Sequence, residues 1–246
     1  MSYLVFHLVL VLPPIVLMAA TLPASLDEFG GWRGRMALPL IAGIALSYTT
    51  AWDNYLVARE VWWYGPNRVL ATIGFVPVEE YLFFILQPIL TGLFLFQYLG
   101  RQNDPVPPAG PESAWTGFLA FTAVSVAGAL LLASGPKGLY MGLVLTWAGP
   151  LLAGMWLYDG ETLWGHRRTL LYAVGVPTVY LWGADAIAIA TGIWTISGTY
   201  TLGLSVGSLP VEEATFFLMT NLLVVKGILL LIYGSHEALG RSIRRR

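Results

Sequence analysis

The hydrophobic residues of this chain gather in long, nearly uninterrupted stretches, separated by short segments rich in Gly, Pro and charge. A helix needs about 20 predominantly apolar residues to cross a bilayer, and each stretch approaches that length. Backbone amides in lipid need partners within the segment, and these stretches are too long and uniformly apolar for barrel strands. The pattern predicts an all-α integral membrane protein. Its seven candidate transmembrane helices are residues 3–20, 38–57, 78–99, 115–133, 139–157, 169–190 and 210–233.

Composition and charge narrow the class further. Of the 246 residues, 57% are hydrophobic and 11% are charged, and the net charge of −1 excludes a general nucleic-acid binder. The chain has no cysteine, so disulfides and thiolate metal sites are excluded, and its three histidines are too scattered for a metal site. No basic residue precedes the first apolar stretch, since the first Lys or Arg is Arg33. We therefore interpret this stretch as a retained helix rather than a signal peptide.

Lys and Arg are divided unequally between the two sides of the predicted bundle. Cytoplasmic loops carry an excess of these residues. We therefore expect the chain in the cell (inner) membrane, with its N-terminus outside and its C-terminus in the cytoplasm. The predicted cytoplasmic side carries Arg33, Arg35, Arg101, Arg167, Arg168, Arg241, Arg244, Arg245 and Arg246, and the other side carries Arg59, Arg68 and Lys137.

The second half of the chain repeats the first. The residues that match at an offset of 132 are Trp32 and Trp164, Arg35 and Arg167, Gly43 and Gly175, Asp53 and Asp185, and Trp62 and Trp194. The offset becomes 133 for Pro77 and Pro210 and for Phe83 and Phe216, so the second copy has one inserted residue.

This register predicts two homologous three-helix repeats joined by a linking helix. The extra helix makes both repeats enter the membrane from the same side, so they are parallel and related by a pseudo-twofold axis along the membrane normal. We divide the chain into a first repeat (1–100), a Pro-rich loop with the linking helix (101–136), and a second repeat with a basic cytoplasmic tail (137–246).

Each repeat carries three acidic residues at the edge of its apolar helices. The tetrapeptide Pro-Val-Glu-Glu occurs at 77–80 and again at 210–213. A carboxylate at the centre of a membrane helix costs roughly 2.5–3.5 kcal/mol on insertion scales, which makes such acids functional candidates. A single acid would suffice to complement a helix N-terminus, so the duplicated set favours a site. The candidate catalytic residues are Glu80, Glu213, Glu79, Glu212, Asp53 and Asp185.

Successive helical residues point about 100° apart, which separates the two glutamates of each pair. The face below Glu80 stays partly polar, so we expect Glu80 and Glu213 to look into the bundle and Glu79 and Glu212 to support them. Nearby aromatic rings can stabilise a carbocation by cation–π attraction. The candidate substrate-binding residues are Phe83, Phe84, Phe216, Phe217, Trp62, Trp194, Gln87 and Asn221.

Burial and a neighbouring like charge both favour the neutral form of a carboxylic acid, so we expect some of these acids to be protonated at pH 7. A carboxylic acid beside a carboxylate, under aromatic rings and away from water, is a proton donor and acceptor pair for a hydrophobic substrate.

The chain resembles the membrane-integral lycopene cyclase family, in the single-chain, two-repeat form of the heterodimeric bacterial and fungal-type lycopene cyclases. The matching segments are the opening residues 3–8 with Leu12, Pro13 and Pro14, the stretch 75–84, and the second motif at 210–213. The doubled Pro-x-Glu-Glu is the most specific of these, and the resemblance covers nearly the whole chain.

The resemblance implies a lycopene β-cyclase. Such an enzyme cyclises one or both ψ end groups of lycopene to β-ionone-type rings, giving γ- or β-carotene through a carbocation with no net redox change. It implies no cofactor, flavin included, and a hydrophobic carotenoid substrate that arrives from the bilayer. Membrane lipids and other enzymes of the carotenoid pathway are the further expected partners. The second copy has Ala214 and Thr215 where the first has Tyr81 and Leu82, so we expect one composite site with divided roles.

Two other functions compete with this interpretation. A small-solute transporter can have the same three-plus-one-plus-three arrangement of parallel repeats, with the acids lining a water-filled path. A seven-helix chromophore protein would use Lys226 in the last span as a Schiff-base lysine.

Overall fold

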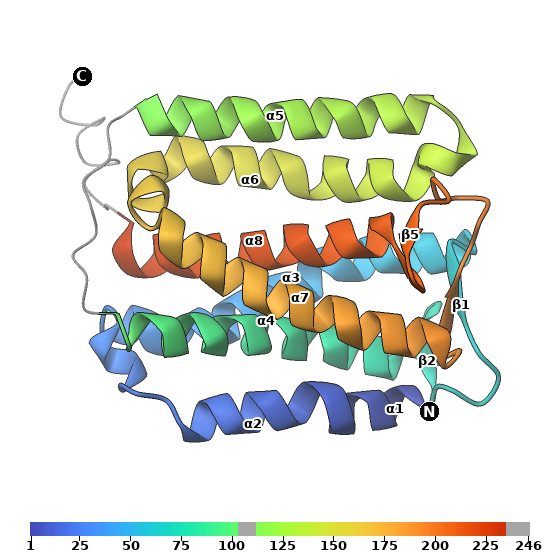
Figure 1. Ribbon diagram of the computed structural model, residues 1–246, viewed down its shortest axis with the longest axis horizontal. Helices are drawn as coiled ribbons and strands as arrows, with labels where there is room; N and C mark the ends of the chain where they lie inside the picture. The colour runs from blue at the N-terminus through green and yellow to red at the C-terminus, as the bar shows by residue number, and fades with distance from the viewer. Residues whose placement is uncertain (103–111, 235–246) are drawn as a thin grey trace.

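The computed structural model describes residues 1–102 and 112–234. Long helices run side by side along one direction, and the N-terminus and the short strands lie at the same end of the bundle (Figure 1). The predicted Pro-rich segment from Asp104 to Pro108 and the basic tail fall outside the described residues. The helices are α1 (Tyr3–Phe6), η1 (His7–Val11), α2 (Leu12–Ala20), η2 (Leu26–Glu28), α3 (Trp32–Ala58), α4 (Val78–Leu99), α5 (Glu112–Ala133), η3 (Pro136–Gly138), α6 (Leu139–Gly165), α7 (Arg167–Ala190) and α8 (Val211–Tyr233).

Within the described residues, six helices are long and apolar enough to cross a membrane. They are 3–20, Val78–Leu99, 114–133, 136–165, Arg167–Ala190 and Val211–Tyr233. The remaining long helix, α3, has 27 residues and begins at Trp32 rather than near residue 38. It is less apolar than the six because it includes Arg33, Arg35 and Asp53. The protein is therefore a helical membrane protein, and the seventh span stays a prediction.

Short strands occur where the sequence predicts only helices and loops. They are β1 (Trp62–Tyr64), β2 (Thr72–Ile73), β3 (Val76–Pro77), β4 (Trp194–Ile196), β5 (Ser205–Val206) and β6 (Leu209–Pro210). A hairpin with a two-residue turn precedes α4 and another precedes α8. Gly74 and Gly207 begin these turns with φ of 65° and 62°, a conformation that glycine adopts without strain.

The loops of the two halves meet in the antiparallel pair β1–β4 (Figure 1). Trp63 lies opposite Thr195, its counterpart at the offset of 132, while Tyr64 lies opposite Trp194. The helices also make equivalent contacts, because α3 packs on α4 and α8 while α7 packs on α8 and α4. α5 packs against α6 at one edge of the bundle, and α2 packs against α4 at the other (Figure 1).

Two tyrosines at equivalent positions, 132 residues apart, join helices of the two halves. Tyr180 joins α7 to the N-terminal helix, and Tyr48 joins α3 to α6. The Tyr180 hydroxyl donates to the Leu10 carbonyl at 2.6 Å, and the Tyr48 hydroxyl donates to the Trp147 carbonyl at 2.9 Å. Pro14 has no N–H to give to the Leu10 carbonyl four residues earlier, so Tyr180 supplies a donor that the helix lacks. These bonds hold the N-terminal helix against α7 and α6 against α3.

Replacing Tyr180 with Phe should lower the free energy of unfolding in detergent by about 1 kcal/mol, because the Leu10 carbonyl loses a donor in apolar surroundings. Tyr172→Phe on the same helix is the matched control, since the Tyr172 hydroxyl makes no hydrogen bond within the described residues and its ring only stacks on Tyr98. Thermal unfolding followed by circular dichroism measures both. Equal midpoints for the two variants would contradict this role.

Candidate functional site

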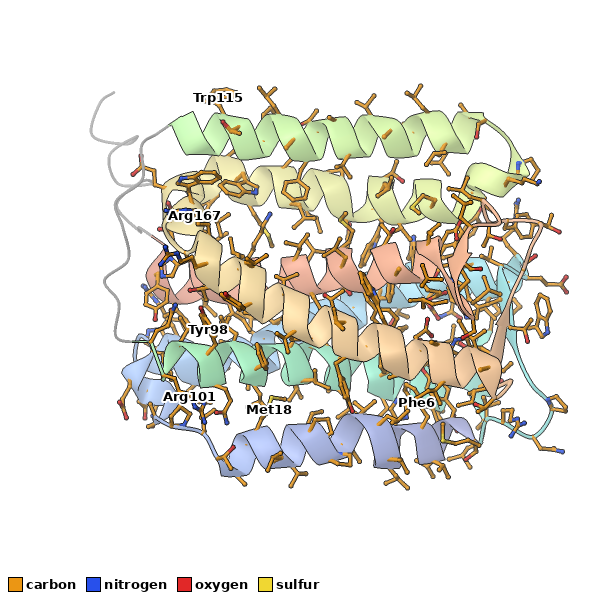
Figure 2. The ribbon with its side chains drawn as sticks, viewed as in Figure 1. Phe6, Met18, Tyr98, Arg101, Trp115 and Arg167 are labelled. Carbon is orange, nitrogen blue, oxygen red and sulfur yellow. The ribbon has the colours of Figure 1, made fainter. Side chains whose placement is uncertain are left out.

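Four of the six predicted acids line one small chamber of about 40 Å³ at the strand-bearing end of the bundle. They are Asp53 on α3, Glu80 on α4, Asp185 on α7 and Glu213 on α8. The complete lining is Tyr3, Phe6, Trp52, Asp53, Trp62, Tyr64, Glu80, Phe83, Tyr140, Leu181, Asp185, Trp194, Ile196, Glu213, Phe216 and Phe217. Phe6 lies near this end, whereas Arg101 and Arg167 lie at the opposite end (Figure 2). Among these lining residues there is no Lys or Arg, so the carboxyls have no cationic partner.

Glu80 accepts two hydrogen bonds on a single oxygen. The hydroxyls of Tyr3 and Tyr64 donate to its Oε2 at 2.8 and 2.9 Å. Trp62 Nε1 donates in turn to the Tyr64 hydroxyl at 3.2 Å. Burial, and then the nearby charge of Glu80, raises the pKa of the Tyr64 hydroxyl well above its usual value, so this phenol remains a proton donor to the hydrogen bond.

Glu213 and Asp185 have fewer partners than Glu80. The Tyr140 hydroxyl donates to Glu213 Oε1 at 2.7 Å, and Trp194 Nε1 donates to Asp185 Oδ1 at 3.0 Å. The Oδ2 atoms of Asp53 and Asp185 are buried with no hydrogen-bond partner within the described residues. A buried carboxyl oxygen without a donor is poorly suited to carry a charge.

The first glutamate of each pair does not line the chamber. Glu79 Oε1 accepts the Leu70 backbone N–H at 2.8 Å, and Glu212 Oε1 accepts the Leu202 backbone N–H at 2.7 Å. Both side chains are buried, and both bonds hold the loop that precedes their helix. Glu80 and Glu213 thus face the chamber as expected, while Glu79 and Glu212 support the backbone around it.

Five of the predicted aromatic residues line the chamber, namely Trp62, Trp194, Phe83, Phe216 and Phe217. The other three candidates lie elsewhere. Phe84 and Gln87 line a second, apolar cavity, which Phe83 and Phe216 also border.

Asn221 lines neither cavity, although the sequence places it among the substrate-binding candidates. Its Oδ1 accepts from Gln87 and Thr91, at 2.5 and 2.6 Å, and its Nδ2 donates to Thr178 at 2.9 Å. The amide is therefore committed to joining α4, α7 and α8. Its partners on α4 and α7 could not be read from the sequence.

The phenols that hold the chamber acids were missed by sequence reasoning. Tyr3 and Tyr140 play matching roles, and they are related by an offset of 137, as are Pro13 and Pro150. Extending the repeat comparison into the first helices with this new offset would have found them. Tyr64 had no such signal, because its counterpart in the second half is Ile196.

Lys226 is remote from the acids. Its side chain is 1% exposed, and its Nζ lies 3.9 Å from the ring centroid of Phe121 and 5.1 Å from that of Trp156. Within the described residues Nζ has no hydrogen-bond partner. The recorded contacts of this amine are therefore with the two aromatic rings, in the geometry of a cation–π interaction.

Fold and site together define an integral membrane protein with a buried acidic chamber walled by aromatic rings. The lycopene cyclase family model matches residues 1–99 and 137–231, and the chain belongs to this family. The two matched segments leave out residues 100–136, which include α5.

Curated relatives agree with the family. The chain is 42% identical over 230 residues to a lycopene beta-cyclase of Halobacterium salinarum, covering 93% of this chain and 95% of that protein. It is 34% identical over 234 residues to a bifunctional lycopene cyclase/phytoene synthase of Blakeslea trispora, covering 92% of this chain and 38% of that protein. A protein of the same name from Aspergillus oryzae is 33% identical over 208 residues, covering 82% of this chain and 35% of the relative. No solved structure matches the chain.

Replacing Glu212 with Ala should lower the free energy of unfolding by about 1–3 kcal/mol, because the part-buried Leu202 N–H loses its acceptor. Glu161→Ala is the control, since Glu161 is exposed on α6. Chemical unfolding in detergent, followed by tryptophan fluorescence, compares the two. A loss no larger than that of the control would remove the structural role of Glu212.

Proposed function

We propose that this protein cyclises the ψ end group of lycopene, at one or both ends, to a β-ionone-type ring, giving γ- or β-carotene. The observation that carries the proposal is the convergence of Asp53, Glu80, Asp185 and Glu213 on one chamber without a cation. A transporter would need polar groups along a water-filled path, whereas these acids are confined to one chamber and the neighbouring cavity is lined mostly by apolar and aromatic side chains. Family membership also favours the cyclase.

The proposed reaction consists of one proton gained and one proton lost. A carboxylic acid protonates the terminal alkene, which leaves a tertiary carbocation. A second alkene of the same end group attacks this cation, so one carbon–carbon σ-bond replaces one π-bond and the positive charge moves into the new ring. A carboxylate then removes a ring proton and restores a double bond. No electrons are exchanged, so the chemistry needs no electron carrier.

The hydrogen bonds suggest how the acids divide these steps. Two phenols donate to Glu80 Oε2, and donors of this kind stabilise a carboxylate, so we assign Glu80 as the base. Glu213 receives a single phenol donor through Oε1, which leaves its other oxygen able to carry the transferred proton. Asp53 and Asp185 hold further protons, because an ionised form would leave Oδ2 charged and without a donor.

The aromatic walls favour the cationic intermediate over the neutral reactant. Trp62, Trp194, Phe83 and Phe217 line the chamber, and cation–π attraction is worth about 2 kcal/mol or more when the cation is desolvated. A substrate end group that fills the chamber displaces water, which prevents the cation from being captured as an alcohol. The chamber thus combines two requirements of the reaction, a proton source and an electron-rich wall.

For the architecture we propose seven transmembrane helices in two parallel three-helix repeats, with α5 as the linking helix. The equivalent packing of α3 on α8 and α7 on α4 supports the pseudo-twofold, as does the pairing of Trp63 with its counterpart Thr195. We place the N-terminus outside and the C-terminus in the cytoplasm of the cell membrane. Arg101 and Arg167 then lie at the cytoplasmic end, and the chamber lies toward the opposite face (Figure 2).

In this proposal the substrate is a carotenoid dissolved in the bilayer, and lipids surround the bundle. Other enzymes of the carotenoid pathway are the natural neighbours, because they release a substrate too apolar to cross water. The proposal includes no nucleic-acid partner.

Glu80→Gln and Glu213→Gln should each lower the rate of cyclisation at least 100-fold, because a positioned acid or base contributes about 10²–10⁴-fold to rate. Pigment chromatography after expression in cells that accumulate lycopene measures this. The protein should still be recovered from the membrane in normal amount, because Gln keeps the shape of the side chain. Full activity in both variants would remove the assignment.

Cyclisation in D₂O should place one deuterium in each ring formed, because the proton added to the alkene comes from a carboxyl that exchanges with solvent. Mass spectrometry of the carotene product counts the deuterium. Rings formed without deuterium would exclude protonation by an exchangeable acid, and a product lighter than lycopene by two hydrogens would show oxidation instead.

A further inference from the structure

The chamber is too small to hold a carotenoid. About 40 Å³ has room for roughly three water centres. A larger, almost entirely apolar groove of about 140 Å³ lies beside it, between α3, α4, α6 and α8. The two spaces share Phe83 and Phe216, which therefore form the partition between them.

The groove opens on the side of the bundle. Ile44, Tyr48 and Leu151 line it, and their side chains are 52%, 40% and 42% exposed. Leu151 lies on a helix that is apolar enough to span a membrane, and in the seven-span architecture proposed above all three side chains face lipid. The groove follows α3 from Thr49 back to Ile41, a rise of about 12 Å along the helix axis. It therefore runs from the chamber toward the other side of the membrane.

A continuous aromatic wall connects the lipid-facing edge to the chamber. The Tyr48 and Trp147 rings stack with centroids 5.0 Å apart, Trp147 and Phe216 are 6.2 Å apart, and Phe216 and Trp52 are 5.7 Å apart. Trp52 and Phe216 line the chamber itself. Stacked rings present flat π surfaces, which suit a conjugated, rod-like hydrocarbon better than a flexible saturated chain.

Resting on the function proposed above, we propose that this groove, named here the α3–α6 groove, is the binding site and lateral entrance for the polyene chain. The end group passes between Phe83 and Phe216 into the acid chamber, while the conjugated chain lies along α3 and continues into the bilayer. Rotation of the two Phe side chains joins the groove and the chamber into one space. The occupant is a long conjugated hydrocarbon. The groove has no charged residue that could bind a polar ligand, and the only charged residue types that line the chamber are Asp and Glu.

At two groove positions the second half of the chain carries a larger residue. Ala45 and Thr49 in the α3–α6 groove correspond to Pro177 and Leu181, and Leu181 is buried against the chamber. The groove residues are thus the smaller member of each pair. At position 49, Leu is therefore a groove-filling side chain that the fold already accommodates at the equivalent site.

The test is to fill the groove without touching the acids. Ala45→Phe places a ring in the groove, and Thr49→Leu introduces the residue found at position 181. Gly43→Phe is the matched control on the same helix, because a side chain at Gly43 meets nothing within 4 Å. Conversion of lycopene and elution as a monodisperse peak in detergent are measured for each. Ala45→Phe should convert lycopene at least tenfold more slowly than Gly43→Phe, with Thr49→Leu also slowed.

A binding measurement separates the groove from the chemistry. In the Glu213→Gln background, lycopene should remain bound to the purified protein, and adding Ala45→Phe should remove it while adding Gly43→Phe should not. Absorbance of the co-purified polyene measures this. Wild-type conversion and polyene retention by monodisperse Ala45→Phe and Thr49→Leu proteins would overturn the groove. Groove-dependent polyene binding by a wild-type protein that forms no ring would support the groove and defeat the proposed cyclase function.

Discussion

The structure depends on keeping four carboxyl groups together in an apolar helix bundle, with no Lys or Arg among the residues that line their chamber. Ionising all four would leave repelling, desolvated charges with no partner, a cost that hydrogen bonds from Tyr3, Tyr64, Tyr140 and Trp194 can offset only in part. The free energy is lower when most of the four carboxyl groups are protonated. A store of protons in a space walled by aromatic rings is what an alkene needs to become a cation. Burial therefore keeps the acids in the protonated form that the proposed chemistry uses.

In the proposed two-repeat architecture, the two halves supply matching residues, and the differences between the halves give the site its direction. Each half contributes an Asp, a chamber Glu, a loop-holding Glu and a phenol on its first helix. Tyr64 breaks the match, because its counterpart is Ile196. Two phenols therefore hold Glu80 and one holds Glu213, and two equivalent acids become different. In a perfectly symmetric site, the two glutamates would have the same environment, and neither would be the preferred proton donor or acceptor.

Much of this was predictable from the sequence. Apolar length gave the helices, and the offset between repeats found the acids, because both signals depend on local sequence. The helical periodicity also separated Glu80 from Glu79. The hydrogen bonds could not be predicted in the same way. Tyr3 lies 77 residues from Glu80, and Asn221 bonds to two other helices, so their partners depend on how helices pack rather than on their own sequence. The short strand pair β1–β4 was missed for that reason too, since it joins loops from different halves.

Infrared spectroscopy of the purified protein tests the central claim most directly, because the carbonyl stretch of a neutral carboxylic acid is resolved from the bands of a carboxylate. The account predicts a neutral-acid band at pH 7 that shifts in D₂O and weakens stepwise in Asp53→Asn, Asp185→Asn and Glu213→Gln. A spectrum at pH 7 that contains only carboxylate bands, or a neutral-acid band that all three substitutions leave intact, would contradict it.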